Sequence, residues 1–147
     1  MTTMSLAFEV KLAQPHDRAI ETVTAALKSE GFGVLTRIDA HTTFREKLGV
    51  EFRPYSILGA CNPPLAHRVL TAQPDIGLLL PCNVVVRAAA DGGQIVGFMD
   101  PIAVMQMTDD PAVTAVATEV RARLERVRSV LMSGAGQQGL DGRSAAD

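Results

Sequence analysis

The longest regular pattern in the sequence is a row of apolar residues near its C-terminal end. The row advances by three or four residues at a time through Val113, Val116, Val120, Leu124, Val127 and Leu131. That period is typical of an α-helix with one apolar stripe and one wet face. Such a helix needs a second layer to cover its stripe, so the rest of the chain has to supply an apolar surface.

Shorter segments supply that surface, because they carry the apolar and alternating patterns of β-strands. We predict strands over residues 6–12, 32–38, 55–61, 76–88 and 94–100. Helices are predicted to begin near residues 15, 39, 62, 100 and 110, where capping residues or first-turn prolines stand. The order β-α-β-α-β-α-β-β-α-α predicts an α+β fold, a two-layer sandwich with helices packed on one face of a mixed β-sheet.

The predicted strand 76–88 is apolar on both faces for much of its length, which is typical of a central strand or a subunit contact. Pro81 lies inside it and lacks a backbone donor, so we expect a bulge or a local edge there. Leu79 and Val85 indicate that the sheet face away from the helices is apolar too. A homodimer would cover that face economically.

The length of 147 residues predicts one domain, which we place over residues 1–132. Residues 133–147 contain four glycines and almost no large apolar residue, so we expect a flexible C-terminal tail. The tail contains the pattern Gly134-x-Gly136-x-x-Gly139, which matches a dinucleotide-binding motif. That motif needs a strand before it and a helix after it, and neither is predicted here, so no cofactor is assigned.

The charge balance argues against a general nucleic-acid binder, because 14 basic residues face 16 acidic ones for a net charge of −2. Four arginines between Arg121 and Arg128 alternate with Glu119 and Glu125, which is typical of a solvated helix face. The longest apolar run is shorter than a membrane helix needs. The first ten residues contain no Lys or Arg, unlike a signal peptide. We therefore expect a cytoplasmic protein with reduced thiols and no membrane or nucleic-acid partner.

The most unusual feature is that each of the two cysteines is followed by one of the two asparagines, as Cys61-Asn62 and Cys82-Asn83. Cys61 ends a predicted strand just before a helix N-terminus, where the helix dipole favours a thiolate. A strand-helix-strand unit usually gives parallel neighbours through a right-handed crossover, so the two pairs could meet. They therefore form the centre of a candidate ligand site.

Structural explanations of the same residues stay open. Free cysteine packs as a small hydrophobe, and Cys82 shares the alternation of core positions. Asn62 fits a helix cap, whereas Asn83 in an apolar strand is a candidate ligand contact. His67 lies one helical turn further on and could lean back toward Cys61. Cys61, Cys82 and His67 would suit zinc or monovalent copper, with a dimer completing the site.

Two further groups of residues carry polar side chains. Lys47, Arg53 and Tyr55 flank a Gly-Val loop and could contact an anion, although solvated side chains explain them as well. His16 and His41 are expected to be solvated residues near helix starts.

Three stretches, GFGVLTRID, EKLGVEFRPYSILGACNPPLAHRVL and IGLLLPCNVVV, resemble the bacterial and archaeal family named domain of unknown function 302. The resemblance extends over residues 8–131. The matching positions include Lys47, Leu48, Gly49, Arg53, Tyr55, Gly59, Cys61, Asn62, Pro63, Pro81, Cys82 and Asn83. It implies a compact α+β fold and a homodimer, and it carries no established activity, catalytic residue or cofactor.

Three functions follow as hypotheses. The first is a module that binds a small ligand or a soft metal ion at the two Cys-Asn pairs. The second is thiol-based redox or sulfur transfer, with Cys61 as nucleophile and Cys82 resolving it. The third is a non-catalytic structural or regulatory homodimer. No carboxylate pair, catalytic triad or phosphate loop is visible, so hydrolysis and phosphoryl transfer are not predicted.

Overall fold

The structure is a computed structural model that describes residues 6–134. Its elements, in chain order, are β1 (Ala7–Leu12), α1 (His16–Lys28), β2 (Gly33–Asp39), α2 (Ala40–Leu48), β3 (Tyr55–Cys61), α3 (Pro63–Ala72), the 3₁₀ helix η1 (Pro74–Leu79), β4 (Cys82–Ala88), β5 (Gln94–Met99), α4 (Pro101–Val104), the 3₁₀ helix η2 (Met105–Met107) and α5 (Pro111–Met132). From residue 135 onward, the predicted flexible tail lies outside the described residues.

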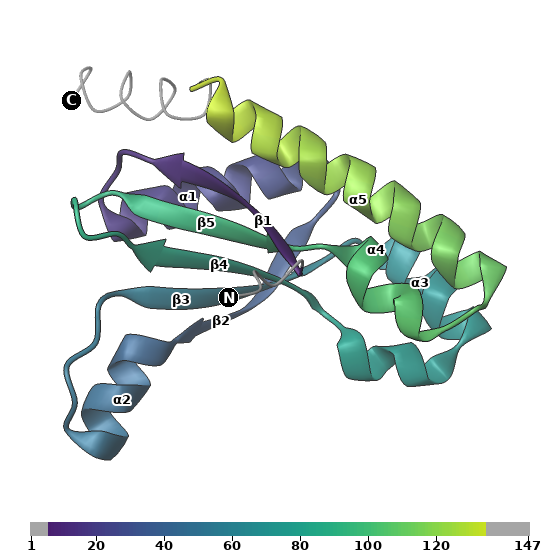
Figure 1. The fold of residues 1–147 in the computed structure, drawn as a ribbon, viewed down its shortest axis with the longest axis horizontal. Coiled ribbons are helices and arrows are strands. Elements are labelled where there is room, and N and C mark those ends of the chain that lie inside the picture. Colours follow the sequence, from purple (N-terminus) through teal and green to yellow (C-terminus); the bar gives the residue numbers. More distant parts are fainter. Residues whose placement is uncertain (1–5, 135–147) are drawn as a thin grey trace, which may run out of the picture.

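The five strands form one sheet in the order β1-β5-β4-β3-β2, and helices pack against it (Figure 1). The predicted α+β sandwich is therefore confirmed. The prediction of a mixed sheet is wrong, because all four strand pairings are antiparallel. The chain leaves β3 at Cys61 and re-enters the sheet at Cys82, which pairs with Ala60. Both residues lie at the same end of the sheet, so β4 runs antiparallel to β3.

The predicted strand 76–88 is wrong in its first half. Residues Pro74–Leu79 form η1, the Leu80-Pro81 peptide bond is cis, and β4 begins only at Cys82. An apolar run of this length does not separate a strand from a buried helical turn, and the prolines at both ends remove two backbone donors. Pro81 precedes the strand and makes no bulge in it. The register shift of this sheet lies in β2, between Val34 and Thr36.

Helices α1 and α5 cover one face of the sheet. The apolar stripe predicted for α5 is confirmed, since all six of its residues are buried, with Val113, Leu124, Val127 and Leu131 fully so. They meet alternate residues of the strands, such as Leu58, Val84, Val86 and Phe98, which are also fully buried. Together these residues make one continuous core.

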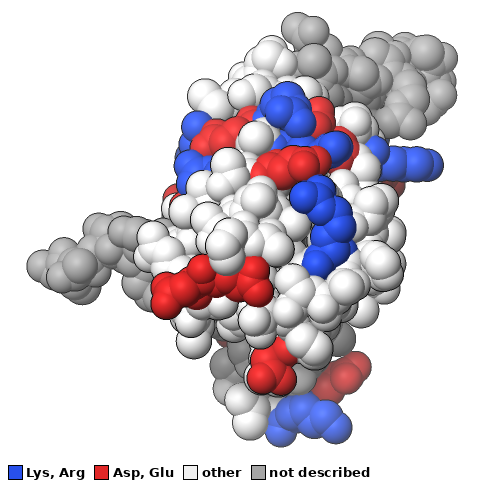
Figure 2. Space-filling model, turned by 90° about the vertical axis from the view of Figure 1, so that its right-hand side faces the viewer, with Lys and Arg blue, Asp and Glu red and all other residues white. Residues whose placement is uncertain are grey.

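The wet side of α5 carries ion pairs, as the interleaved charges indicated. Arg121 and Arg128 contact Glu125, Arg123 contacts Glu119, and Arg126 contacts Glu30. In Figure 2, which views the right-hand end of Figure 1, basic and acidic side chains lie beside one another in the upper half. No helix within residues 6–134 is both long and apolar enough to cross a bilayer.

Helix α2 is the exception to this packing. It projects from the edge of the sheet, away from α5 (Figure 1), and none of its nine residues is buried. Gly49 ends it in the left-handed conformation, φ 64°, which glycine adopts readily. Asp39 stands at its N-cap position but makes no side-chain capping bond.

Candidate functional site

The two cysteines lie at one end of the sheet and line the same cavity. Cys61 is the last residue of β3 and Cys82 the first of β4. The cavity has a volume of about 50 Å³ and reaches between the sheet end and helices α3, α4 and α5. Its walls are apolar apart from the thiols and one amide, and they are formed by Phe32, Ala60, Cys61, Asn62, Leu65, Ala66, Val69, Leu80, Pro81, Cys82, Pro101, Met105, Val116, Ala117 and Val120.

The two thiols differ in their surroundings. Cys82 is buried and Cys61 is half-buried, and neither forms a disulfide. Burial raises the pKa of the Cys82 thiol to about 11, and the nearby Cys61 raises it further. At neutral pH, Cys82 is therefore a protonated, weakly polar wall of the cavity rather than a nucleophile.

The two asparagines do not share a role. Asn62 is buried; its side-chain oxygen accepts from the Leu65 amide at 3.4 Å, and its nitrogen donates to the Glu30 carbonyl at 3.4 Å. It is thus the predicted helix cap, and it lies against Gly31, where a Cβ would come within 2.8 Å of its Nδ2. Asn83 is exposed, pairs with Gly59 and does not line the cavity. The fold therefore does not bring both Cys-Asn pairs into one site.

His67 is exposed on α3 and is not part of the cavity wall. Within residues 6–134, no three His, Cys, Asp or Glu side chains lie close enough to hold a metal ion. The described part of one chain thus brings together two of the three predicted ligands, Cys61 and Cys82.

The predicted anion contacts separate in a similar way. Arg53 and Tyr55 line one shallow groove with Phe52 and Arg87, whereas Lys47 is exposed on α2 outside it. Arg87 is 3.5 Å from Glu9, so one of the two groove arginines already has an acidic neighbour.

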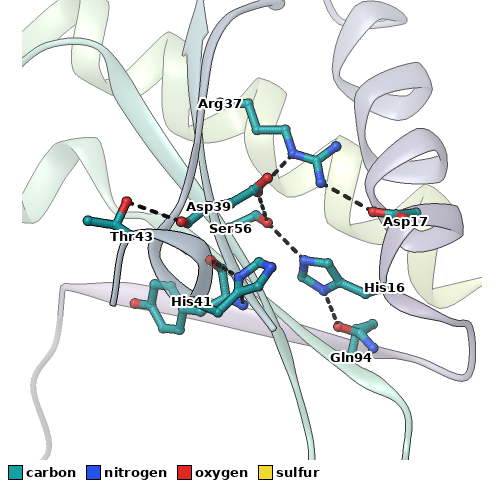
Figure 3. Close-up of polar contacts among 9 residues, drawn as sticks. His16, Asp17, Arg37, Asp39, His41, Thr43, Ser56 and Gln94 are labelled. Carbon is teal, nitrogen blue, oxygen red and sulfur yellow. Dashed lines mark hydrogen bonds and ion pairs between the residues drawn. The ribbon is translucent and has the colours of Figure 1, made fainter. Parts of the chain in front are cut away.

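A polar network at the opposite end of the sheet was not predicted (Figure 3). His16 is half-buried, with Nδ1 2.7 Å from Gln94 Oε1 and Nε2 2.8 Å from Ser56 Oγ. The Ser56 hydroxyl donates to Asp39 Oδ1 at 2.6 Å, and Arg37 Nε donates to the same oxygen at 2.9 Å. The expectation that His16 is a solvated helix-start residue is wrong.

His41 is half-buried as well, so the same expectation is wrong for it. Its Nδ1 accepts the backbone N–H of Tyr55 at 2.9 Å, and its ring meets that of His16 edge-on with centroids 5.7 Å apart. The same Nδ1 lies 3.1 Å from the Tyr55 carbonyl oxygen, so both backbone polar groups of Tyr55 face this ring and hold α2 against β3.

The charges of this network stabilise one another. The Ser56 hydrogen bond, followed by that from Arg37, lowers the pKa of Asp39. The bond to Asp39, together with Asp17 at 3.2 Å, raises the pKa of Arg37. One signal in the sequence could have revealed the network. Ser56 lies two residues before Leu58 and four before Ala60, so all three face the core side of β3, where Ser56 is fully buried. A hydroxyl at such a position needs partners.

Comparisons with known proteins agree with one another. The family model described as "Domain of unknown function DUF302" matches residues 8–131. The chain is 32% identical to the protein in the "Crystal structure of uncharacterized conserved protein DUF302 from Bacillus stearothermophilus". That alignment covers 87% of this chain and 99% of the other, with a TM-score of 0.79. A search of curated proteins gave no significant match.

Proposed function

The chain belongs to the family described as domain of unknown function DUF302, and we propose that it is a module that binds a small ligand, whose apolar end occupies the cavity beside Cys61 and Cys82. The observation that carries this proposal is the apolar wall around a cavity of about 50 Å³. About 10–15 Å³ is enough for one water molecule, so the cavity has room for about four groups of that size. A small molecule fits, or the end of a longer one.

The surroundings of the thiols favour an uncharged ligand. A resolving thiol acts as the thiolate, whereas burial keeps Cys82 protonated at neutral pH. A metal ion would displace that proton, but residues 6–134 place no third His, Cys, Asp or Glu side chain beside the two thiols. A neutral thiol is a weakly polar, polarisable surface that suits apolar groups. Soft-metal binding and sulfur transfer through Cys61 and Cys82 therefore rank behind small-ligand binding.

The proposal is tested by nuclear magnetic resonance of the ¹⁵N-labelled chain with xenon as an apolar probe. We expect saturable shifts of amides around the cavity, such as those of Leu65 and Val69. Ala117 is buried in the cavity wall, so Ala117→Leu fills the space, whereas Ala115→Leu changes an exposed residue of the same helix. The shifts should disappear in Ala117→Leu and persist in Ala115→Leu. Absence of shifts in the unaltered chain, or equal shifts in both variants, would overturn the proposal.

Native mass spectrometry of the purified protein, beside the same sample denatured, separates the alternatives. A non-covalent organic mass supports small-ligand binding. A metal mass that disappears in a Cys61→Ala, Cys82→Ala double variant would replace it with metal binding. A sulfur or oxygen adduct that survives denaturation would replace it with thiol chemistry.

A homodimer is the second candidate, and the sheet face turned away from α1 and α5 favours it. Ile38, Ile57, Val85 and Gly97 stand opposite one another in a row across four strands of this face. Ile38 is 53% exposed. The row continues to Glu9 on β1, so apolar groups fill most of it and one charge ends it. A second copy of the chain would cover the row.

Helix α2 adds to the same argument. Leu48 on α2 is 68% exposed, and Phe52 after it is 49% exposed and contacts Phe44. A helix of nine residues with no buried residue is marginal by itself in water, since isolated helices shorter than about 12–15 residues barely form. A partner surface would supply the packing that it lacks.

Sedimentation velocity at protein concentrations up to about 100 µM tests the dimer, because a specific association depends on concentration. We expect Val85→Lys to give a monomer and Thr118→Lys, an exposed change on α5, to leave the dimer intact. A monomeric unaltered chain, or a Val85→Lys dimer of unchanged stability, would contradict this second candidate.

A further inference from the structure

A surface groove lies directly outside the apolar cavity. It runs between α4, η2 and the first turns of α5, at the end of the molecule where α3, α4 and α5 meet (Figure 1). Met105 and Ala117 line both the cavity and the groove, and both residues are buried. The cavity and the groove therefore share a wall that these two side chains form.

Met105 is the part of this wall that can move. It begins the 3₁₀ helix η2, and its unbranched side chain has three rotatable bonds, so it adapts readily to what lies beside it. Ala117 has no side-chain rotamer to change and is fixed on the long helix α5. A rotation of the Met105 side chain would join the cavity to the groove without moving a helix.

The groove is more polar than the cavity. Asp109 is exposed and is the one titratable side chain among the residues that line the groove. Thr114 donates its hydroxyl proton to the Asp110 carbonyl at 3.2 Å, so its oxygen is left as an acceptor. These two side chains give the groove two acceptors and a negative charge. The other lining residues are Ile102, Met105, Gln106, Thr108 and Ala117.

The N-terminus of α5 does not turn the groove into an anion site. Asp110 caps this helix, because its carboxylate accepts from the Ala112 amide at 2.9 Å. The Thr114 amide donates to the Asp110 carbonyl at 3.0 Å. Helix amides bind an anion only when they point at it, and these two already have partners. A carboxylate or phosphate in the groove would face the like charge of Asp109.

We propose that the ligand is a straight aliphatic chain whose head group donates a hydrogen bond and carries no negative charge. The chain passes Met105 and ends beside Cys61 and Cys82, while the head group stays in the groove and donates to Asp109. An aliphatic alcohol is the simplest member of this class. The inference rests on the proposed function, because it takes the cavity as the binding site and adds the chemistry of the ligand's other end.

The two ends of such a ligand would contribute differently. Each methylene group transferred from water into the apolar cavity raises the affinity roughly fourfold. One hydrogen bond from the head group to the exposed Asp109 adds roughly three- to tenfold. The chain therefore supplies most of the affinity, and the groove selects the head group.

The test is a nuclear magnetic resonance titration of the ¹⁵N-labelled full chain with n-hexanol, its isomer methyl pentyl ether, and n-hexanoate. We expect n-hexanol to shift the Leu65 and Val69 amides and to bind roughly three- to tenfold tighter than the ether, which cannot donate. The carboxylate of n-hexanoate should bind most weakly. Asp109→Ala should abolish the preference for n-hexanol over the ether. Asp75→Ala, which changes an exposed carboxylate outside both spaces, should keep it.

Variants of Met105 test the route of the chain. Met105→Leu keeps a similar volume but branches the side chain, so n-hexanol should associate more slowly. Met105→Ala leaves the shared wall open, so association should be faster. Met107→Ala changes an 81% exposed residue of the same 3₁₀ helix that lines neither space, and the rate should not change. The rates are obtained from the widths of the amide signals during the titration.

Xenon separates a failure of this inference from a failure of the proposed function, because xenon has no head group. If xenon shifts the cavity amides but n-hexanol and the ether bind equally, the cavity remains a binding site and this inference is wrong. The same holds if n-hexanol associates at one rate in both Met105 variants. If xenon gives no shifts either, the proposed function and this inference are both wrong.

Discussion

The reactivity of Cys82 is the sharpest test of how the cavity wall behaves chemically. We consider a Cys61→Ser variant, in which Cys82 is the sole thiol. At about pH 8, a free cysteine of pKa about 8.5 is roughly one-quarter thiolate. With its pKa raised to about 11 by burial, Cys82 is roughly one-thousandth thiolate at that pH. The fraction available to react thus falls by roughly two hundredfold.

Part of this decrease in reaction rate is offset, because a thiolate of higher pKa is a stronger nucleophile. With a Brønsted slope of about 0.4–0.5, the gain over this difference is roughly tenfold. The reaction of Cys82 with an aromatic disulfide reagent should therefore be roughly twentyfold slower than in the same variant denatured in urea, and steric burial can only slow it further. The rate should also keep rising about tenfold per pH unit up to about pH 10, whereas the denatured reference levels off near pH 9.

The raised pKa of Cys82 also makes the stability of the fold fall as pH rises. The folded pKa of Cys82 lies above the unfolded one, so its contribution is fully present below about pH 8.5 and is lost as pH rises through about 11. The free energy of unfolding should fall by on the order of 3 kcal/mol over that window relative to a Cys82→Ala variant, measured by guanidinium titration. A Cys82 that reacts within threefold of the denatured reference, with no difference in alkaline stability, would refute the reasoning.

The remaining predictions concern packing. Leu124 is fully buried on α5, so Leu124→Ala should lower the free energy of unfolding by about 2–5 kcal/mol, whereas Val130→Ala, at a 39% exposed position, should cost well under about 1 kcal/mol in the same denaturant titration. At Gly59, a Cβ would come within 2.3 Å of Thr36 Oγ1, so Gly59→Ala should destabilise by about 1–3 kcal/mol. Thr36→Ala should recover part of that loss in a double-mutant cycle, and Gly33→Ala, with open space around its Cβ, should be nearly neutral by calorimetry. A full loss at Gly33 or no coupling between the other two positions would contradict this account.

Much of the fold could be read from local patterns. The stripe of α5 was visible because a helix repeats every three to four residues, and the buried faces of the strands followed from alternation. Asn62 was recognisable as a cap because it precedes Pro63 at the start of a helix. These features depend on neighbours along the chain, and such interactions leave a signature at short spacing.

The candidate site could be predicted less well. The sequence indicated both thiols, and the structure places them on one cavity. The sequence did not indicate that Asn83 lies outside the cavity, nor that the 3₁₀ helix η1 replaces the start of the predicted strand 76–88. The His16 network remained invisible because its partners lie 40 and 78 residues away along the chain.

The sequence by itself determined the kinds of elements, their order, the apolar stripe of α5 and the family to which the chain belongs. Each of these follows from residues close together in the chain, where periodicity and capping act. Only the tertiary structure decided the direction of β4, the side of the sheet that each polar residue faces, and the hydrogen-bonded contacts that join His16, Ser56 and Asp39. Those outcomes depend on which distant segments pack together, and packing selects among several arrangements that the same local preferences allow.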